Sequence, residues 1–271
     1  MNAIDSRLKW LPLAALAAAY AVMWVGGVGH YAVYGGPPMD MPWAASVFLA
    51  LGGLLIVVTS RGRDLIGLMA AALLGFVAEV IGVRYGFIFG PYRYTDVLQP
   101  QILGAPLVML SAWMMLVSYC RQMLMNLNLP RLVEAALAAL WMTAIDLVID
   151  PLAANQLGYW RWTQSGAYYG IPAWNFIGWF MVSFIIFNAS LWGLRKNRTA
   201  CHVGLSIVIF FTAIAFSYGL ALAGMIGLGL CLAHLALKER RRDGETEGRR
   251  ERGTEGRSDR ETERKRDGGI K

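Results

Sequence analysis

The chain has 271 residues, of which 56% are hydrophobic and only 16% are charged, with a net charge of +7. The segment 238–271 holds 13 of the 25 Lys and Arg residues and 10 of the 18 Asp and Glu residues, so the first 237 residues carry too few charges for a soluble globule. Neither part is a dense basic patch, and the three Cys residues include no CxxC pair. These features exclude a soluble enzyme, a nucleic-acid-binding protein, a secreted disulfide scaffold and a cysteine zinc site.

Apolar windows follow one another along the chain. In chain order they are 10–28, 41–59, 65–83, 102–120, 132–149, 173–194 and 203–237. A helix needs about 20 residues to cross a bilayer core of about 30 Å. Because backbone groups in lipid must be hydrogen-bonded within the protein, we expect these windows to be helices. The first apolar stretch is long for a signal peptide, so we expect it to be retained.

The basic residues between the windows lie mostly on one side. One set precedes the first window or follows the second, fourth and sixth: Arg7, Lys9, Arg61, Arg63, Arg121, Arg131, Arg195, Lys196 and Arg198. The other set is Arg84, Arg93 and Arg161. The positive-inside rule therefore predicts a cytoplasmic N-terminus. A cytoplasmic basic tail requires an even number of crossings, so we divide 203–237 near 218–224.

The sequence thus predicts an all-α fold, a polytopic membrane helix bundle of about eight transmembrane helices, with seven as the alternative. Residues 1–237 form the predicted transmembrane helical domain. Residues 238–271 have no apolar periodicity to bury, so we expect a charged, disordered cytoplasmic tail. Both termini are then cytoplasmic.

Three acidic residues gather near one end of the predicted bundle. Glu79 lies in the last turns of the third window, and Asp146 and Asp150 end the fifth. The loops that follow, 84–101 and 151–172, are rich in Tyr, Trp, Gly and Pro and lie on the same side of the membrane by parity. Because Asp146 and Asp150 are spaced i, i+4, they share one helix face.

Carboxylates inside a bilayer are costly unless they are paired or functional. One structural interpretation is ion pairing with the arginines of the same loops: Arg84, Arg93 and Arg161. Another is capping of a turn at Asp150–Pro151. We favour a functional role for the group.

The chemistry of such a group follows from burial. Burial and a neighbouring like charge both favour the protonated form of a carboxyl group, which is then a general acid. A second, ionised carboxylate orients water, and aromatic faces stabilise a cation. These groups suit acid chemistry on an apolar substrate at a membrane interface, and they also suit a proton-coupled transporter.

Several blocks of sequence resemble one known family. Residues 79–94, EVIGVRYGFIFGPYRY, resemble the integral-membrane carotenoid biosynthesis family, which includes the carotenoid C-1′,2′ hydratases of the γ-carotene and bisanhydrobacterioruberin type. The resemblance covers about residues 65–195. Its other blocks are GAP at 104–106, the segment from Asp146 to Pro151, WRW at 160–162, GAYYGIP at 166–172 and NFIGW at 175–179.

The resemblance implies cofactor-free and metal-free addition of water to the terminal double bond of an acyclic carotenoid end group. It implies a carotenoid substrate, contact with membrane lipid, other carotenoid-pathway enzymes as partners, and a bacterial or archaeal cell membrane. An extended carotenoid is about as long as the bilayer core, so its end group would lie at one interface. The alternative is a proton-coupled transporter or a lipid- or carotenoid-binding membrane protein. A transporter's carboxylates belong near mid-membrane, whereas these lie near one end, which favours the enzyme.

The residues can be assigned to roles on this basis. Glu79 is the first choice as proton donor, because it is the lone charge in an otherwise apolar window. Asp146 and Asp150 are the expected water-orienting or cation-stabilising pair. The expected substrate-binding residues are Tyr92, Arg93, Tyr94, Trp160, Trp162, Tyr168, Tyr169, Trp174 and Asn175.

Overall fold

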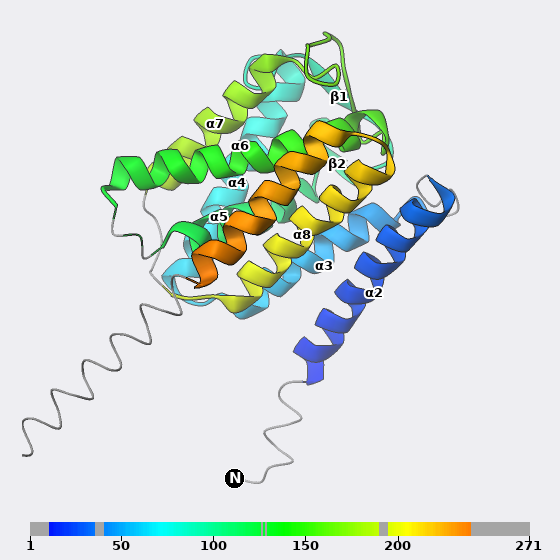
Figure 1. The fold of residues 1–271 in the computed structure, drawn as a ribbon. Coiled ribbons are helices and arrows are strands. Elements are labelled where there is room, and N and C mark those ends of the chain that lie inside the picture. The colour runs from blue at the N-terminus through cyan, green and yellow to red at the C-terminus, as the bar shows by residue number, and fades with distance from the viewer. Residues whose placement is uncertain (1–10, 36–40, 126, 128, 190–194, 240–271) are drawn as a thin grey trace, which may run out of the picture. The chain divides into compact units, whose positions relative to one another are not determined.

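A computed structural model describes residues 11–35, 41–125, 127, 129–189 and 195–239 (Figure 1). Within these residues the chain forms eight helices. They are α2 (Leu11–Tyr34), α3 (Ala44–Thr59), α4 (Arg63–Tyr85), α5 (Met109–Leu124), α6 (Arg131–Asn155), α7 (Ala173–Asn188), α8 (Arg198–Ser217) and a last helix, Ala221–Glu239. The all-α helix bundle predicted from the sequence is confirmed.

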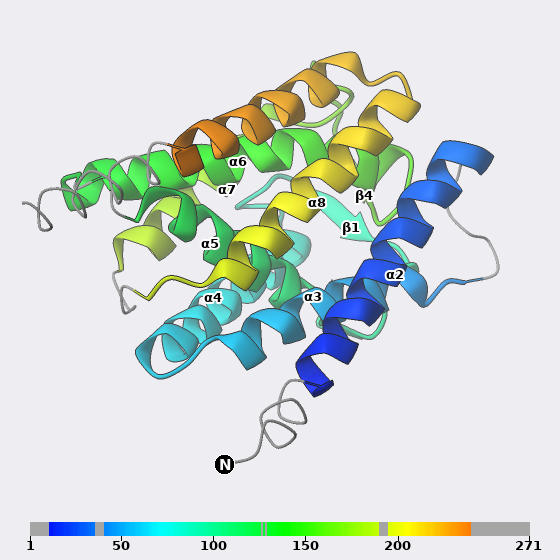
Figure 2. The same cartoon turned by 60° about the horizontal axis from the view of Figure 1, so that its bottom comes forward.

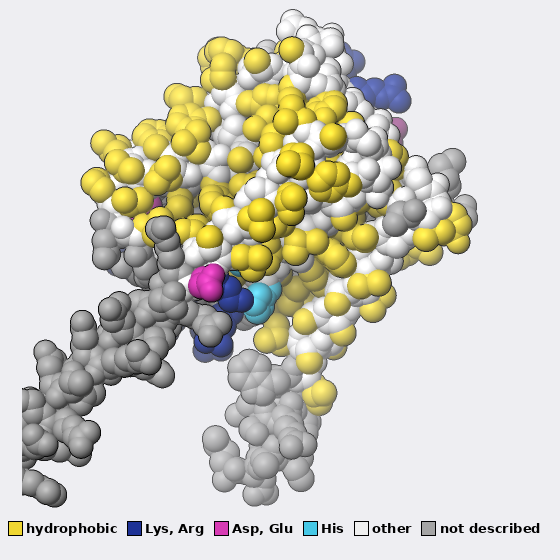
Figure 3. Space-filling view, in the orientation of Figure 1, with side chains coloured by type: hydrophobic (Ala, Val, Ile, Leu, Met, Phe, Trp, Pro, Cys, Tyr) yellow, Lys and Arg dark blue, Asp and Glu magenta, His cyan; other side chains and the backbone are white. Residues whose placement is uncertain are grey.

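Most of the described helices have the length and composition of membrane spans, whereas α3 and α7 are apolar but shorter. Five of them are long and apolar enough to cross a bilayer: Leu11–Tyr31, α4, α6, α8 and Ala221–Glu239. The visible face is largely covered by hydrophobic side chains (Figure 3), and large apolar residues such as Val22 and Leu132 are exposed. The window 203–237 is divided, since α8 ends at Ser217 and the next helix begins at Ala221.

The predicted boundary at residue 237 falls close to the end of the described chain. The chain divides into two units, Met1–Cys231 and Leu232–Lys271. In the second unit the structure describes only the end of the last helix, to Glu239. The rest of the predicted tail, residues 240–271, lies outside the described residues.

Helix α5 lies in the middle of the bundle, packed against α3, α4, α6 and α8 (Figure 2). Every residue from Trp113 to Leu124 is buried. The predicted window 102–120 is wrong at its start, because β2 (Gln101–Ile102) and β3 (Ala105–Pro106) pair as a hairpin. The two turn residues between these strands, Leu103 and Gly104, both have positive φ, as a two-residue hairpin turn of type I′ requires.

Helix α6 continues beyond the expected turn at Asp150–Pro151 and ends at Asn155. The prediction of a loop beginning at Pro151 is therefore wrong. Proline in a helix frees the carbonyl four residues earlier, which here belongs to Leu147. The Tyr168 hydroxyl donates a hydrogen bond to this carbonyl oxygen at 2.8 Å. A side chain from the following loop thus replaces the missing backbone donor.

The two aromatic loops meet as a short antiparallel ribbon. Strand β1 (Tyr92–Tyr94) follows α4, and β4 (Trp160–Trp162) follows α6. In the register of the ribbon, Tyr92 faces Trp162 and Tyr94 faces Trp160. Loops more than 60 residues apart in sequence are thereby joined at one end of the bundle, as parity predicted for the two loops.

Candidate active site

The Glu79 carboxylate is held by three neutral donors. It lies on α4 and is only 3% exposed. The hydroxyls of Tyr92 and Tyr94 donate to its Oε2 atom at 2.5 and 2.9 Å. The indole N–H of Trp113 on α5 donates to Oε1 at 3.1 Å. Both carboxylate oxygens therefore already accept hydrogen bonds.

Trp113 is positioned by close packing on both sides. Its ring stacks on Trp179 of α7, with centroids 4.6 Å apart and planes 13° from parallel. On α4, a Cβ atom at Gly75 would lie 2.1 Å from the Trp113 ring. Only glycine at this position lets the indole approach α4 and reach Glu79.

Asp146 and Asp150 share one amide. Both lie on α6, one turn apart, and are 3% and 1% exposed. The Nδ2 atom of Asn175, in the first turn of α7, donates to Oδ2 of Asp146 at 2.8 Å and to Oδ2 of Asp150 at 2.6 Å. An amide nitrogen carries two hydrogens, so both are used. The Oδ1 atom of Asp146 accepts no hydrogen bond from the described residues.

Asp150 receives its remaining donors from the ribbon. The indole N–H of Trp160 donates to Oδ1 of Asp150 at 2.8 Å, and that of Trp162 donates to the same atom at 3.4 Å. The two strands therefore donate hydrogen bonds to different carboxylates. The tyrosines of β1 donate to Glu79 on α4, and the tryptophans of β4 donate to Asp150 on α6.

The aromatic rings of the ribbon pack against one another in pairs across the two strands. The ring centroids of Tyr92 and Trp162 are 5.0 Å apart, and those of Tyr94 and Trp160 are 5.7 Å apart. Burial, followed by the charge of the neighbouring Glu79, raises the pKa of Tyr92 and of Tyr94 well above the usual value for tyrosine. Both phenols therefore remain protonated donors.

The carboxylate cluster of Glu79, Asp146 and Asp150 forms no ion pair with an arginine of the described residues. Arg93 and Arg161 face one another in the ribbon register and are exposed. Arg84 is also exposed. An ion pair elsewhere in the described residues joins Arg121 to Asp64, near the start of α4. Pairing of the three carboxylates with the loop arginines, one structural interpretation of the sequence, is therefore absent from the described residues.

Three more of the expected substrate-binding residues make structural contacts. Trp174 is exposed and donates to the backbone oxygen of Phe87 at 2.8 Å. Tyr169 has a positive φ of 50°, and its backbone oxygen accepts from the Asn155 amide at 2.8 Å. Tyr168 donates to the backbone oxygen of Leu147, which Pro151 leaves without a donor within α6. None of the three donates to a carboxylate.

Tyr168→Phe tests this last role. The variant leaves a backbone carbonyl without a donor, so we expect a loss of about 1–3 kcal/mol in the free energy of unfolding. Unfolding of the purified protein in detergent measures it. Tyr85→Phe is the matched control, because Tyr85 is exposed. Equal stability of the two variants would contradict the role of Tyr168.

Sequence reasoning missed Gly75, Trp113 and Trp179. Gly75 and Trp113 lie in apolar segments, where glycine and tryptophan are ordinary packing residues, so no local signal marks them. Trp179 ends the NFIGW block of the family resemblance, but that block gave it no role in the site. They become part of the site only because α4, α5 and α7 meet there.

Two cavities found in the described part of the chain lie away from the carboxylates. One is at the end where α4 and α8 begin, and the other is an apolar cavity between α2, α3 and α8. Among the described residues, no group of three His, Cys, Asp or Glu side chains is arranged to hold a metal ion. The cluster instead offers carboxyl groups, neutral donors and aromatic faces. These groups can exchange protons and stabilise positive charge.

The comparisons with known proteins agree on one biological context. A family described as carotenoid biosynthesis protein matches residues 43–237, a range that includes all three carboxylates and the ribbon. The chain is similar to the bisanhydrobacterioruberin hydratase of Haloarcula japonica, with 25% identity over 224 residues, covering 74% of this chain and 71% of that protein. No solved structure matches the chain.

Proposed function

The chain belongs to the carotenoid biosynthesis protein family, and from this premise we propose that it adds water to the terminal C-1′,2′ double bond of an acyclic carotenoid end group. It is an integral membrane protein with a role in carotenoid modification. The hydratase name of its Haloarcula japonica relative supports the choice of hydration. The proposed reaction is that of a hydro-lyase and uses no cofactor.

The observation that carries the proposal is the composition of the buried cluster. Glu79, Asp146 and Asp150 are buried with only neutral hydrogen-bond donors, next to the packed tyrosine and tryptophan rings of the ribbon. Protonating an isolated alkene requires a Brønsted acid, a role that a protonated carboxyl group can fill. Negative charge and aromatic faces nearby stabilise the resulting cation. The cluster supplies both at one end of the bundle.

The reaction balances with one carboxyl group acting as acid and then as base. A carboxylic acid transfers its proton to C-2′, and the π electrons of the double bond form the new C–H bond. This leaves a tertiary cation at C-1′. Water forms the C–O bond to C-1′ and releases a proton to a carboxylate, which restores the acid. The product is a tertiary alcohol.

The hydrogen bonds support a division of roles that differs from the sequence-based assignment. Both oxygens of Glu79 already accept donors, so Glu79 is suited to stabilising the cation. Asp146 keeps an oxygen that accepts no hydrogen bond from the described residues, which is what a proton donor needs. Asp150 and Asn175 hold Asp146 in place, and the two aspartates form a pair able to share one proton.

Pigment analysis tests the proposed function. Expressed in cells that accumulate lycopene or γ-carotene, the chain should yield a more polar pigment that is heavier by one water. The visible spectrum should be unchanged, because the hydrated bond lies outside the conjugated chain. Several acyclic-ended carotenoids should be tried. If none gives a new pigment, hydration is excluded, and a transport or carotenoid-binding role takes its place.

The proposed orientation in a bacterial or archaeal cell membrane places both termini in the cytoplasm and the ribbon on the other side. Single cysteines at Gln99 and Gln164, both exposed, should react with an impermeant thiol reagent from outside. The background is a variant without the native cysteines. A cysteine at the exposed Arg63 should react only from the cytoplasmic side. Labelling in the reverse pattern would overturn the orientation.

A further inference from the structure

A basic cavity lies at the end of the bundle where α4 and α8 begin and α5 ends. Its volume is about 260 Å³, far more than one water molecule needs. Four basic residues and one acidic residue line it: Arg61, Arg121, Arg195, Lys196 and Asp64. The cavity is distinct from the carboxylate cluster. Asp64 and Glu79 lie 15 residues apart on α4, about 22 Å along the helix axis.

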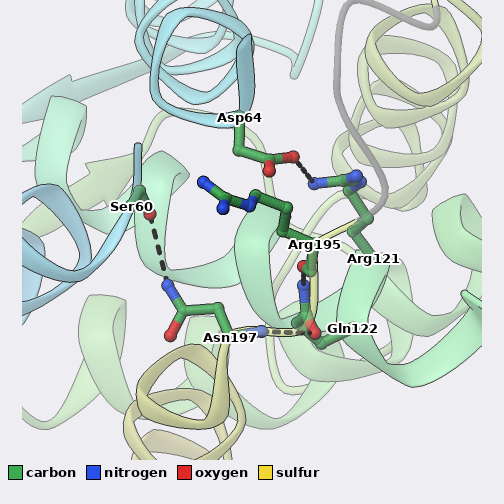
Figure 4. Close-up of polar contacts among 6 residues, drawn as sticks. All are labelled: Ser60, Asp64, Arg121, Gln122, Arg195 and Asn197. Atoms are coloured by element: carbon green, nitrogen blue, oxygen red, sulfur yellow. Dashed lines mark hydrogen bonds and ion pairs between the residues drawn. The ribbon is translucent and has the colours of Figure 1, made fainter. Parts of the chain in front are cut away.

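The cavity wall is built by a network of polar contacts (Figure 4). The Gln122 side chain donates to the backbone oxygen of Arg195 at 3.0 Å and accepts from the backbone N–H of Asn197 at 3.0 Å. The Asn197 amide donates to the Ser60 hydroxyl at 3.2 Å, and its oxygen caps the N-terminus of α8. The network fixes the segment that carries Arg195 against α5 and the end of α3.

The charge within the cavity is strongly positive. Four cations against one carboxylate leave a net charge of +3, and that carboxylate, Asp64, forms an ion pair with Arg121 at 2.9 Å. Figure 4 shows the Arg195 guanidinium pointing into the space between Asp64 and Ser60, without an ion pair to Asp64. In the described chain, neither Arg61 nor Arg195 has a carboxylate partner.

We propose that this cavity binds a phosphate-bearing anion. Guanidinium groups present paired N–H donors that match phosphate oxygens, and basic pockets between membrane helices are suited to phosphate headgroups. Arg195 and Arg61 contact the anion from the exposed side, and the buried Arg121 forms the inner wall. The phosphate belongs either to an anionic phospholipid or to a soluble phosphate or diphosphate. The proposal does not depend on the hydration reaction.

Native mass spectrometry of the full chain in detergent tests the proposal with three probes: phosphatidylglycerol, phosphatidylcholine and inorganic diphosphate. The wild type should bind phosphatidylglycerol or diphosphate in preference to phosphatidylcholine. The double variant Arg61→Gln/Arg195→Gln should bind the preferred probe about tenfold more weakly or worse. Diphosphate that displaces phosphatidylglycerol indicates a soluble ligand, and phosphatidylglycerol binding that resists diphosphate indicates a lipid. Either result supports the site.

The matched control removes the same number of positive charges, two, from residues that lie outside the cavity. Arg63 and Arg198 are exposed at the starts of α4 and α8 but do not line the cavity. Arg63→Gln/Arg198→Gln should bind the probe as the wild type does, with the charged tail present in every variant. The proposal is overturned if both double variants weaken binding equally, if neither does, or if the wild type binds none of the probes selectively. Circular dichroism confirms that each variant is folded.

Discussion

Asp146→Asn should lower the rate of carotenoid hydration by a factor of about 10²–10⁴, the contribution of a well-placed general acid. Asparagine keeps the shape of the side chain and an oxygen for the Asn175 donor, but it has no acidic proton. The measurement is hydrated pigment per unit of membrane-inserted protein. Asp96→Asn is the control, because Asp96 is an exposed carboxylate of the ribbon loop. Near wild-type hydration by Asp146→Asn would exclude Asp146 as the acid.

Glu79→Gln separates the two assignments of the proton donor. If Glu79 stabilises the cation, the variant should form product more slowly than wild type but faster than Asp146→Asn. If Glu79 is the donor, as the sequence suggested, Glu79→Gln abolishes product and Asp146→Asn retains activity. Asp150→Asn belongs in the same series, because Asp150 binds both Asn175 and the β4 tryptophans.

Gly75→Ala should cost about 1–3 kcal/mol in the free energy of unfolding and should also reduce hydration. The added Cβ would lie 2.1 Å from the ring of Trp113. That ring is fully buried and stacked on Trp179, so it cannot move aside without repacking. Displacing it breaks the Trp113 hydrogen bond to Glu79. Thermal unfolding in detergent and pigment analysis measure the two effects.

The control for this variant is another helical glycine, Gly29→Ala in α2. A Cβ at Gly29 would meet no atom within 4 Å, and alanine favours helix by about 1 kcal/mol over glycine. Gly29→Ala should therefore leave stability unchanged or slightly raised, and hydration unchanged. A Gly75→Ala variant that behaves in the same way would show that the close approach of α4 and Trp113 is not required.

Hydropathy and charge were enough to predict the bundle, because crossing a bilayer constrains the local sequence strongly. Each membrane-spanning helix needs a long apolar window, and a carboxylate within or next to such a window is easily recognised in the sequence. The parity of the spans placed the loops after Glu79 and Asp150 on one side, and the ribbon joins these loops. The i, i+4 spacing placed Asp146 and Asp150 on one face, where a single amide binds both.

Local pattern could not predict the partners of these carboxylates. Three contacts at the site join residues that are distant in the chain. Strand β1 pairs with β4, Trp113 donates to Glu79, and Tyr168 donates to the backbone oxygen of Leu147. The continuation of α6 through Pro151 also depends on such a contact, since the freed carbonyl is satisfied by a loop 17 residues further on. Apolar composition specifies that a segment lies in the membrane. The side chains that meet there depend on how the helices pack.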